Sequence, residues 1–294
     1  MRRLMTALLT GAIALLASQA DAEDRGMIIA VFTKNTTNPA YSAFRLAADQ
    51  VGQATGARIL HFVPKQPDNV DEQKAMVDSV KKLNEARIPI VLAANPLPGD
   101  FVTFVGADDF KIGYSQAKYL FDKLGGKGKI VILEGTTGAP TNRERVRGYK
   151  QALSEAPAIE LLASGIGNYQ QTDAKRVTAD FLQKYREIDA VLSANDSMAL
   201  GALEALKEAN RTTTVIGING ILPAVKKIES GELLATVDFN MFNIGCTATL
   251  AAVRHLKGEP VPDRLMLPAE IIDKSNYRTW LVPVEQRPCP TWPQ

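Results

Sequence analysis

The chain has 294 residues, a length that favours two domains over one, and its 34 Lys and Arg against 32 Asp and Glu give a formal net charge of +2 at pH 7. That near balance argues against a nucleic-acid partner, which requires a basic face on the protein. The two cysteines and two histidines are scattered without the spacing of metal ligands, so neither a metal site nor a cofactor is expected.

Residues 1–22 have the features of a secretory signal. Arg2 and Arg3 supply the charged start, residues 4–17 form an apolar run, and Ala-Asp-Ala at 20–22 is a cleavage site of the A-x-A type. A membrane anchor is the alternative, but the run is shorter than the ~20 residues that a span needs. We therefore expect cleavage after residue 22 and a soluble protein in the periplasm.

The rest of the chain alternates between strand-like and helix-like segments. Strands are expected at residues 27–33, 58–63, 89–94, 102–105, 129–134, 160–164, 190–194, 214–218, 234–239 and 265–272. Helices are expected at residues 40–55, 70–87, 112–124, 143–154, 172–185, 196–206, 222–230 and 243–256. Several strand segments are apolar on both faces, which is typical of strands covered by helices on both sides. Repeated βαβ units predict an α/β fold with two doubly wound parallel sheets.

The corner Asn195-Asp196-Ser197 lies between a predicted strand and a helix rich in Ala and Leu. Asp196 or Ser197 is a good N-cap for that helix, which leaves Asn195 at the carboxyl end of the strand. Ligands bind at this edge of an open parallel sheet, and an amide can both donate and accept hydrogen bonds. The alternative is that Asn195 merely caps a loop.

Further motifs occur in a fixed order along the chain. They are TTNPAY (36–41), GAPTNRERVRGY (138–149), SANDSMALGAL (193–203), VIGING (215–220) and SGELLATV (230–237). With them the chain resembles the periplasmic sugar-binding proteins of the ribose/galactose-binding type, which are the solute receptors of ABC importers. The resemblance implies a periplasmic binding protein type I fold, in which two lobes joined by a three-strand hinge close over one small ligand. It places residues 27–107 plus 240–270 in the first lobe and 108–239 plus 271–294 in the second.

The resemblance also implies a ligand-binding set. Asn38 and Tyr41 match an amide and an aromatic after the first strand, Arg145 matches an arginine that grips ligand oxygens, Tyr169 matches an aromatic wall, and Asn195 matches an amide. Aromatic faces stack on the C–H face of a sugar, while amides and a guanidinium satisfy its hydroxyls. Truncation of Arg145 or Asn195 is therefore expected to abolish binding with little loss of stability. The alternative for Asn38 is turn chemistry before proline, and for Tyr169 an ordinary surface position.

Four further positions depart from the family pattern, in which charged or polar groups clamp sugar hydroxyls. The residues found are the pair Ala94-Asn95, then Asn219, and then Phe239. The pocket keeps its arginine but loses acidic acceptors, which favours a less hydroxylated ligand or an anionic group that pairs with Arg145. A sugar acid, phosphorylated sugar or modified sugar should then outrank glucose, galactose and ribose, unless a carboxylate such as Asp108, Asp109 or Asp238 enters the cleft.

A larger departure lies between residues 63 and 89, where there is room for only one helix. The family usually has helix, strand, helix there, so one βα unit of the first lobe is missing. Either the strand at 89–94 takes the place of the absent central strand, or the lobe is compromised.

An enzyme is the main rival class, but the chain has no G-x-S-x-G elbow, no phosphate-binding loop and no H-E-x-x-H motif. A LacI-type regulator would need a helix-turn-helix domain where this chain has an export signal. We expect a monomeric receptor that captures a sugar or sugar-like solute by hinge closure and delivers it to an ABC permease. The alternative is presentation of the solute to a membrane sensor kinase or chemoreceptor. An oxidising compartment permits a Cys246–Cys289 bridge, but the sequence does not decide whether it forms.

Overall fold

The computed structural model describes residues 26–64 and 70–292, so the predicted signal lies outside the described residues. The strands are β1 (Ile28–Phe32), β2 (Arg58–Phe62), β3 (Val91–Ala93), β4 (Thr103–Gly106), β5 (Gly128–Glu134), β6 (Ile159–Ile166), β7 (Ala190–Ser193), β8 (Thr214–Ile218), β9 (Ala235–Asp238), β10 (Arg264–Met266) and β11 (Glu270–Asp273). The helices are α2 (Pro39–Thr55), α3 (Val70–Glu85), α4 (Asp109–Lys123), α5 (Pro140–Ser154), α6 (Gln171–Lys184), α7 (Asp196–Glu208), α8 (Leu222–Ser230) and α9 (Met241–Leu256), with short 3-10 helices η1 (Tyr277–Leu281) and η2 (Val284–Gln286). This alternation confirms the predicted two-lobed α/β fold.

The second lobe is built on a six-stranded sheet in the order β11-β9-β8-β7-β5-β6, parallel except for β11. Alternate residues of β5 enter two different cores because successive side chains of a strand point to opposite faces. Ile130 and Ile132 pack with Tyr149 of α5 on one face. Val131 and Leu133 belong to the core that contains residues of α6 and α7 on the other face. The predicted double-sided covering of this sheet is confirmed.

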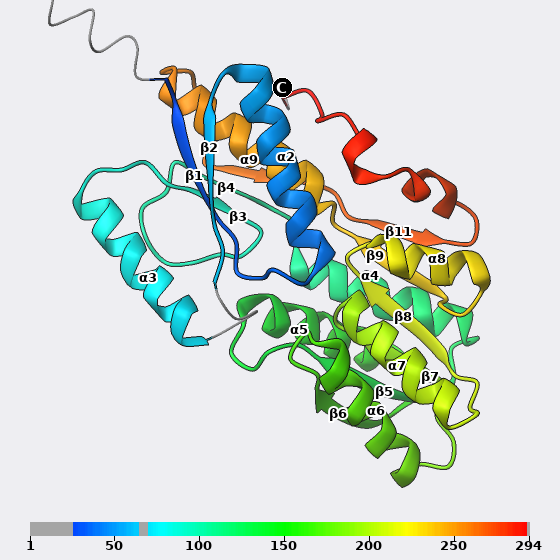
Figure 1. Ribbon diagram of the computed structural model, residues 1–294. Coiled ribbons are helices and arrows are strands. Elements are labelled where there is room, and N and C mark those ends of the chain that lie inside the picture. The colour runs from blue at the N-terminus through cyan, green and yellow to red at the C-terminus, as the bar shows by residue number, and fades with distance from the viewer. Residues whose placement is uncertain (1–25, 65–69, 293–294) are drawn as a thin grey trace, which may run out of the picture.

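The first lobe has its strands in two separate sheets. β1 pairs with β2, and β3 pairs with β4, which in turn pairs with β10. The predicted strand 89–94 therefore does not take the place of the absent central strand beside β1. Figure 1 shows α3, in cyan, standing away from α2 and α9, which pack against each other.

The interruption leaves apolar side chains of the first lobe open to solvent. Ile28 is 56% exposed, and the stacked rings of Phe32 and Phe62 are 53% and 47% exposed, with centroids 4.8 Å apart. An apolar sheet face of this kind is normally packed against another element. The missing βα unit thus leaves one face of β1 and β2 uncovered.

Three crossings join the lobes, at residues 107–108, 239–240 and 267–269. The last crossing corrects the sequence prediction of one strand at 265–272. β10 belongs to the first lobe and β11 to the second, because Pro268 interrupts the run and cannot donate a ladder hydrogen bond.

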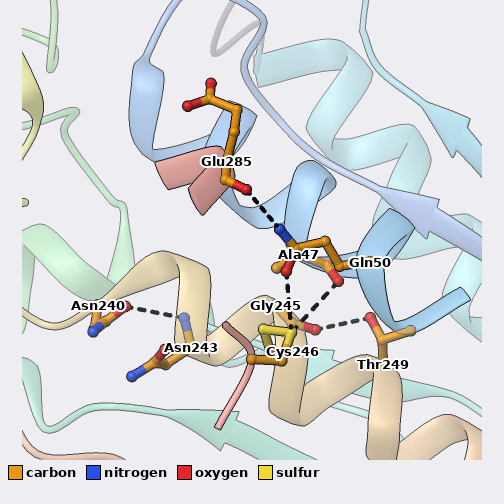
Figure 2. Close-up of a disulfide and its surroundings, with 9 residues drawn as sticks. Ala47, Gln50, Asn240, Asn243, Gly245, Cys246, Thr249 and Glu285 are labelled. Atoms are coloured by element: carbon orange, nitrogen blue, oxygen red, sulfur yellow. Dashed lines mark hydrogen bonds between the residues drawn. A yellow bond between two sulfur atoms is a disulfide. The ribbon is translucent and has the colours of Figure 1, made fainter. Parts of the chain in front are cut away.

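The C-terminal tail makes a further connection between the lobes, and Figure 1 shows it in red, running from β11 back toward α2. On the second lobe, the indole nitrogen of Trp280 donates to Asp238 at 2.8 Å. On the first lobe, the Gln50 amide donates to the Glu285 carbonyl at 3.4 Å, and Cys289 forms a disulfide with Cys246 of α9 (Figure 2). The bridge that the sequence left open is therefore present. Residues 271–294 were expected to belong to the second lobe, but within the described residues the segment 284–292 packs on the first.

Candidate ligand-binding cleft

A cavity that is partly open to solvent lies between the two lobes at the carboxyl ends of their strands. Residues from both lobes line it: Lys34, Asn38, Ala40, Tyr41, Ala94, Asn95, Ala107, Asp109, Thr141, Arg145, Tyr169, Asn195, Asn219, Phe239 and Met241. All eight residues singled out from the sequence are thus brought to one place.

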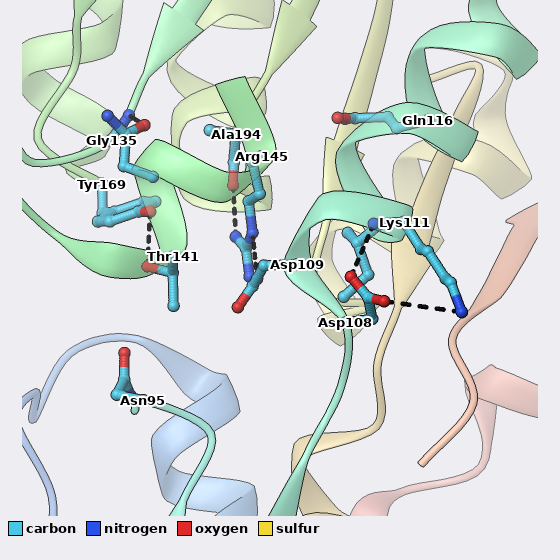
Figure 3. A network of polar contacts seen from close by, with 12 residues as sticks. Asn95, Asp108, Asp109, Lys111, Gln116, Gly135, Thr141, Arg145, Tyr169 and Ala194 are labelled. Carbon is cyan, nitrogen blue, oxygen red and sulfur yellow. Dashed lines mark hydrogen bonds and ion pairs between the residues drawn. The ribbon is translucent and has the colours of Figure 1, made fainter. Parts of the chain in front are cut away.

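Arg145 lies on the second-lobe wall, where α4 and α5 approach very closely. Gly113 and Gly148 allow this approach, since a Cβ on either would lie within 2.5 Å of the backbone of the facing helix. Arg145 donates from Nε to Oδ1 of Asp109 at 2.8 Å and from Nη1 to the carbonyl of Ala194 at 2.7 Å, as Figure 3 shows. The close crossing therefore fixes the guanidinium before any ligand arrives.

This ion pair corrects one premise of the sequence argument, which was that Arg145 would lack an acidic partner unless a carboxylate entered the cleft. Asp109 is that carboxylate. Burial alone would lower the pKa of Arg145, but the adjacent Asp109 reverses the effect and holds the pKa above its usual value. The Arg145 guanidinium also lies 5.3 Å from the ring centroid of Phe239, which covers its face. Arg145 thus remains charged, but its charge is already matched.

Tyr169 forms the aromatic part of the same wall, on a turn in which Asn168 and Tyr169 both have positive φ, at 51° and 59°. The ring packs over Gly135, where a Cβ would lie 2.1 Å from the ring. The hydroxyl group of Tyr169 shares a hydrogen bond of 3.0 Å with the Thr141 hydroxyl. A left-handed backbone at a bulky residue is uncommon and marks a constrained position, here one that directs a ring toward the cavity.

Asn195 holds the Tyr169 turn in place. Its Oδ1 accepts from the backbone N–H of Met198 at 2.8 Å, and its Nδ2 donates to the Tyr169 carbonyl at 3.1 Å. The N-cap of α7 is therefore Asn195, and the sequence prediction of Asp196 or Ser197 is wrong. Capping, the alternative considered for Asn195, is therefore part of its role. Asn195 also lines the cavity, and direct contact with a ligand stays a proposal.

Asp196 is a buried carboxylate that the sequence treated only as a helix cap. It accepts from the Thr236 hydroxyl at 2.6 Å and from the backbone N–H of Ile221 at 3.0 Å. Burial raises its pKa to about 7. Through Ile221 this side chain anchors the loop that presents Asn219, which has a φ of 130°, to the cavity.

The first-lobe wall comes from the ends of β1 and β3. Asn38 caps α2 by accepting from the backbone N–H of Ala40 at 3.0 Å, which is the turn chemistry considered as its alternative. The Asn95 amide lies 3.5 Å from the Tyr41 hydroxyl, as donor in a long hydrogen bond. Figure 3 shows Asn95 on the side of the gap opposite Thr141 and Arg145. A ligand between these walls would touch both lobes.

Sequence reasoning missed several lining residues, above all Lys34. Its ammonium lies 5.8 Å from the ring centroid of Tyr41 and 5.4 Å from that of Tyr169. Its position in the sequence could have indicated it, because Lys34 follows β1 at the same strand end as Asn38 and Tyr41. Thr141 and Met241, in the first turns of α5 and α9, carried the same signal.

Within residues 26–64 and 70–292, no cluster of three or more His, Cys, Asp or Glu side chains is placed to hold a metal ion. Over the same residues, no helix has the length and apolar character needed to cross a membrane.

Comparisons with known proteins agree with this architecture. A family model described as a periplasmic binding protein domain matches residues 68–260. The chain therefore belongs to the periplasmic binding proteins, among the sugar-binding solute-binding proteins of ABC transporters, a family that is not enzymatic. It is 30% identical to the ribose import binding protein of Salmonella typhimurium over 259 residues, which cover 87% of this chain and 84% of the relative. It is 33% identical to a xylitol-binding protein of Mycolicibacterium smegmatis over 224 residues, 75% of this chain and 62% of that one.

Solved structures show the same fold. An ABC transporter solute-binding protein from Mycobacterium smegmatis with bound glycerol is 27% identical, with a TM-score of 0.79 over 86% of this chain and 96% of the other. A solute-binding protein from Bacillus halodurans with bound myo-inositol has a TM-score of 0.80 at 24% identity, covering 88% and 98%. The periplasmic binding protein type I fold predicted from the motifs is thereby confirmed.

Proposed function

We propose that this protein captures a sugar or sugar-like solute between its lobes in the periplasm and delivers it to an ABC importer. The observation that carries the proposal is that one cavity is lined by Tyr41 and Asn95 from one lobe and by Arg145 and Tyr169 from the other. A solute that bridges the two walls would stabilise the closed form, because only there does it contact both.

The chemistry of the walls suits a polyhydroxylated ring. Tyr41 and Tyr169 offer apolar faces for C–H groups, and the amides of Asn95 and Asn219 can both donate and accept. Arg145 uses Nε and Nη1 within the protein, and its fork of five N–H donors leaves others for ligand oxygens. Because the ion pair and the Tyr169 turn are already in place, little ordering would be needed on binding.

Delivery to a permease rather than to a membrane sensor, and action as a monomer, stay predictions. Delivery to a permease is supported by a relative that is named a ribose import binding protein and by a structural neighbour that is described as an ABC transporter solute-binding protein.

The test is a thermal-shift screen of the mature protein against neutral pentoses, hexoses, polyols and sugar acids, with calorimetric titration of every compound that raises the melting temperature. A specific ligand at 100 times its Kd should stabilise the fold by about 2.7 kcal/mol. Arg143→Ala, which removes an exposed arginine from the same helix, serves as the matched control and should bind normally. If no member of the panel shifts melting or gives binding heat, the proposal is wrong.

A further inference from the structure

The C-terminal tail is fastened to both lobes by specific contacts. On the second lobe, η1 packs against α8, and the indole nitrogen of Trp280 donates to the carboxylate of Asp238 at 2.8 Å. On the first lobe, Cys289 is bonded to Cys246 of α9 (Figure 2). The tail thus links the two lobes in addition to the three crossings of the hinge.

The span between these two anchors, residues 281–288, is short and stiffened. Arg287 donates from Nη2 to the carbonyl of Trp280 at 2.9 Å, which closes a turn across the span. Pro283 and Pro288 fix the backbone φ at two further points. A span of this kind acts as a semi-rigid spacer rather than as a slack linker. A movement of one lobe relative to the other must therefore strain or break one of the anchors.

The second-lobe anchor is part of the hinge. Asp238 is the last residue of β9, directly before the second crossing. Its Oδ1 accepts from the backbone N–H of Asn240 at 2.7 Å, while its Oδ2 accepts from Trp280. Phe239, between the two bonded residues, lines the cavity and has its ring centroid 5.3 Å from the Arg145 guanidinium. Through one carboxylate, the tail holds the backbone that places a cleft side chain.

We propose that the tail is a tether that restricts opening of the lobes and thereby raises the affinity of the cleft for its solute. In this account Trp280 is a positioning residue that acts on the hinge through Asp238. The proposal rests on the proposed function, since it concerns the affinity of the same cavity. Binding needs both walls of the cleft, so molecules that are opened more widely lower the apparent affinity in proportion to their population. A tether between the lobes removes such molecules from the unliganded ensemble, and less freedom is then lost on binding.

The experiment releases the tether at its two ends in the full mature chain. Cys246→Ser/Cys289→Ser frees the first-lobe end. Trp280→Phe keeps a ring at the second-lobe end and removes the N–H that donates to Asp238. Thr279→Ala, at an exposed neighbour of Trp280, is the matched control. Each protein, and the triple variant that combines both releases, is titrated calorimetrically with ribose, galactose, sorbitol and galacturonate. Small-angle X-ray scattering without sugar gives the radius of gyration of each.

We expect either release to raise the Kd of the tightest-binding of these compounds about three-fold or more. Either release should also raise the radius of gyration of the unliganded protein, and Thr279→Ala should change neither quantity. Because one tether is cut in both cases, the triple variant should stay within about two-fold of the weaker-binding release, so that the two effects do not add.

A merely structural role for the tail would lower the melting temperature of these variants and leave Kd and the radius of gyration at wild-type values, which would overturn the inference. Losses of affinity that add in full in the triple variant would also overturn it, because the two ends would then act separately. If no sugar binds to the wild type, the proposed function fails, and the radius of gyration of the sugar-free variants decides whether the tether exists.

Discussion

Asp109 at the start of α4 and Arg145 on α5 form a buried ion pair in the cavity wall, 2.8 Å apart, with side-chain exposures of 13% and 5%. The pair has two consequences, since it orders the guanidinium for a ligand and also makes each partner dependent on the other for its burial. Binding and stability are therefore coupled at Arg145, contrary to the sequence expectation that they are separable.

Arg145→Ala should abolish ligand binding and lower the free energy of unfolding by about 3–5 kcal/mol, because it leaves the Asp109 carboxylate buried without its partner. Urea denaturation measures the second effect. The double variant Arg145→Leu/Asp109→Leu should regain much of the stability while still failing to bind. An Arg145→Ala protein as stable as Arg143→Ala would show that the ion pair has no structural role.

Asn195→Ala should lower stability by about 0.5–2 kcal/mol through loss of the α7 N-cap, and should weaken binding by loosening the Tyr169 turn. Asn195→Asp separates the two effects, since it keeps the capping oxygen but loses the donor to the Tyr169 carbonyl. We expect Asn195→Asp to retain more stability than Asn195→Ala and still bind weakly. Unfolding curves and titrations of both variants decide the matter, and full affinity in Asn195→Asp would refute the role of the Tyr169 contact.

Asp196 should make stability depend on pH. Its pKa is raised in the folded state from an ordinary 3.8 to about 7, so the folded protein binds the proton more tightly than the unfolded chain does. The stabilisation by protonation is complete below about pH 4 and is lost as pH rises to about 7. Urea unfolding of wild type and Asp196→Asn across this window should show wild type losing stability relative to the variant as pH rises. The exposed control Asp180→Asn should follow wild type, and a constant difference between wild type and Asp196→Asn would contradict the account.

The Cys246–Cys289 bridge fastens the tail to α9 across a sequence separation of 43 residues. Its removal in Cys246→Ser/Cys289→Ser should cost about 2–5 kcal/mol of stability, and reduction of the wild type should reproduce that loss. Denaturation with and without reductant is the measurement. Unchanged stability of the double variant would mean that the rest of the tail, including the Trp280–Asp238 hydrogen bond, anchors it sufficiently.

The sequence predicts most elements of this fold because hydrophobic periodicity and capping are local signals. It also locates the eight cleft residues, because the ends of parallel strands meet at one edge and family motifs mark those ends. The missing βα unit was equally visible, as a shortfall in length between β2 and β3.

The remaining features depend on distances that no local pattern carries. The pairing of Asp109 with Arg145 follows from the glycine-mediated crossing of α4 and α5. The splitting of the first-lobe sheet and the return of the tail to α9 likewise depend on contacts between residues that are far apart in the sequence. Lys34 was overlooked although it follows β1 at the strand end where cleft residues were sought.

The measurement that tests the central claim most directly is small-angle X-ray scattering of the mature protein with and without its best-binding sugar. If the two lobes close over the solute, the radius of gyration falls on saturation, and it does not fall when the same sugar is added to Arg145→Leu/Asp109→Leu. An unchanged radius of gyration in wild type at saturating, calorimetrically verified occupancy would contradict capture by lobe closure.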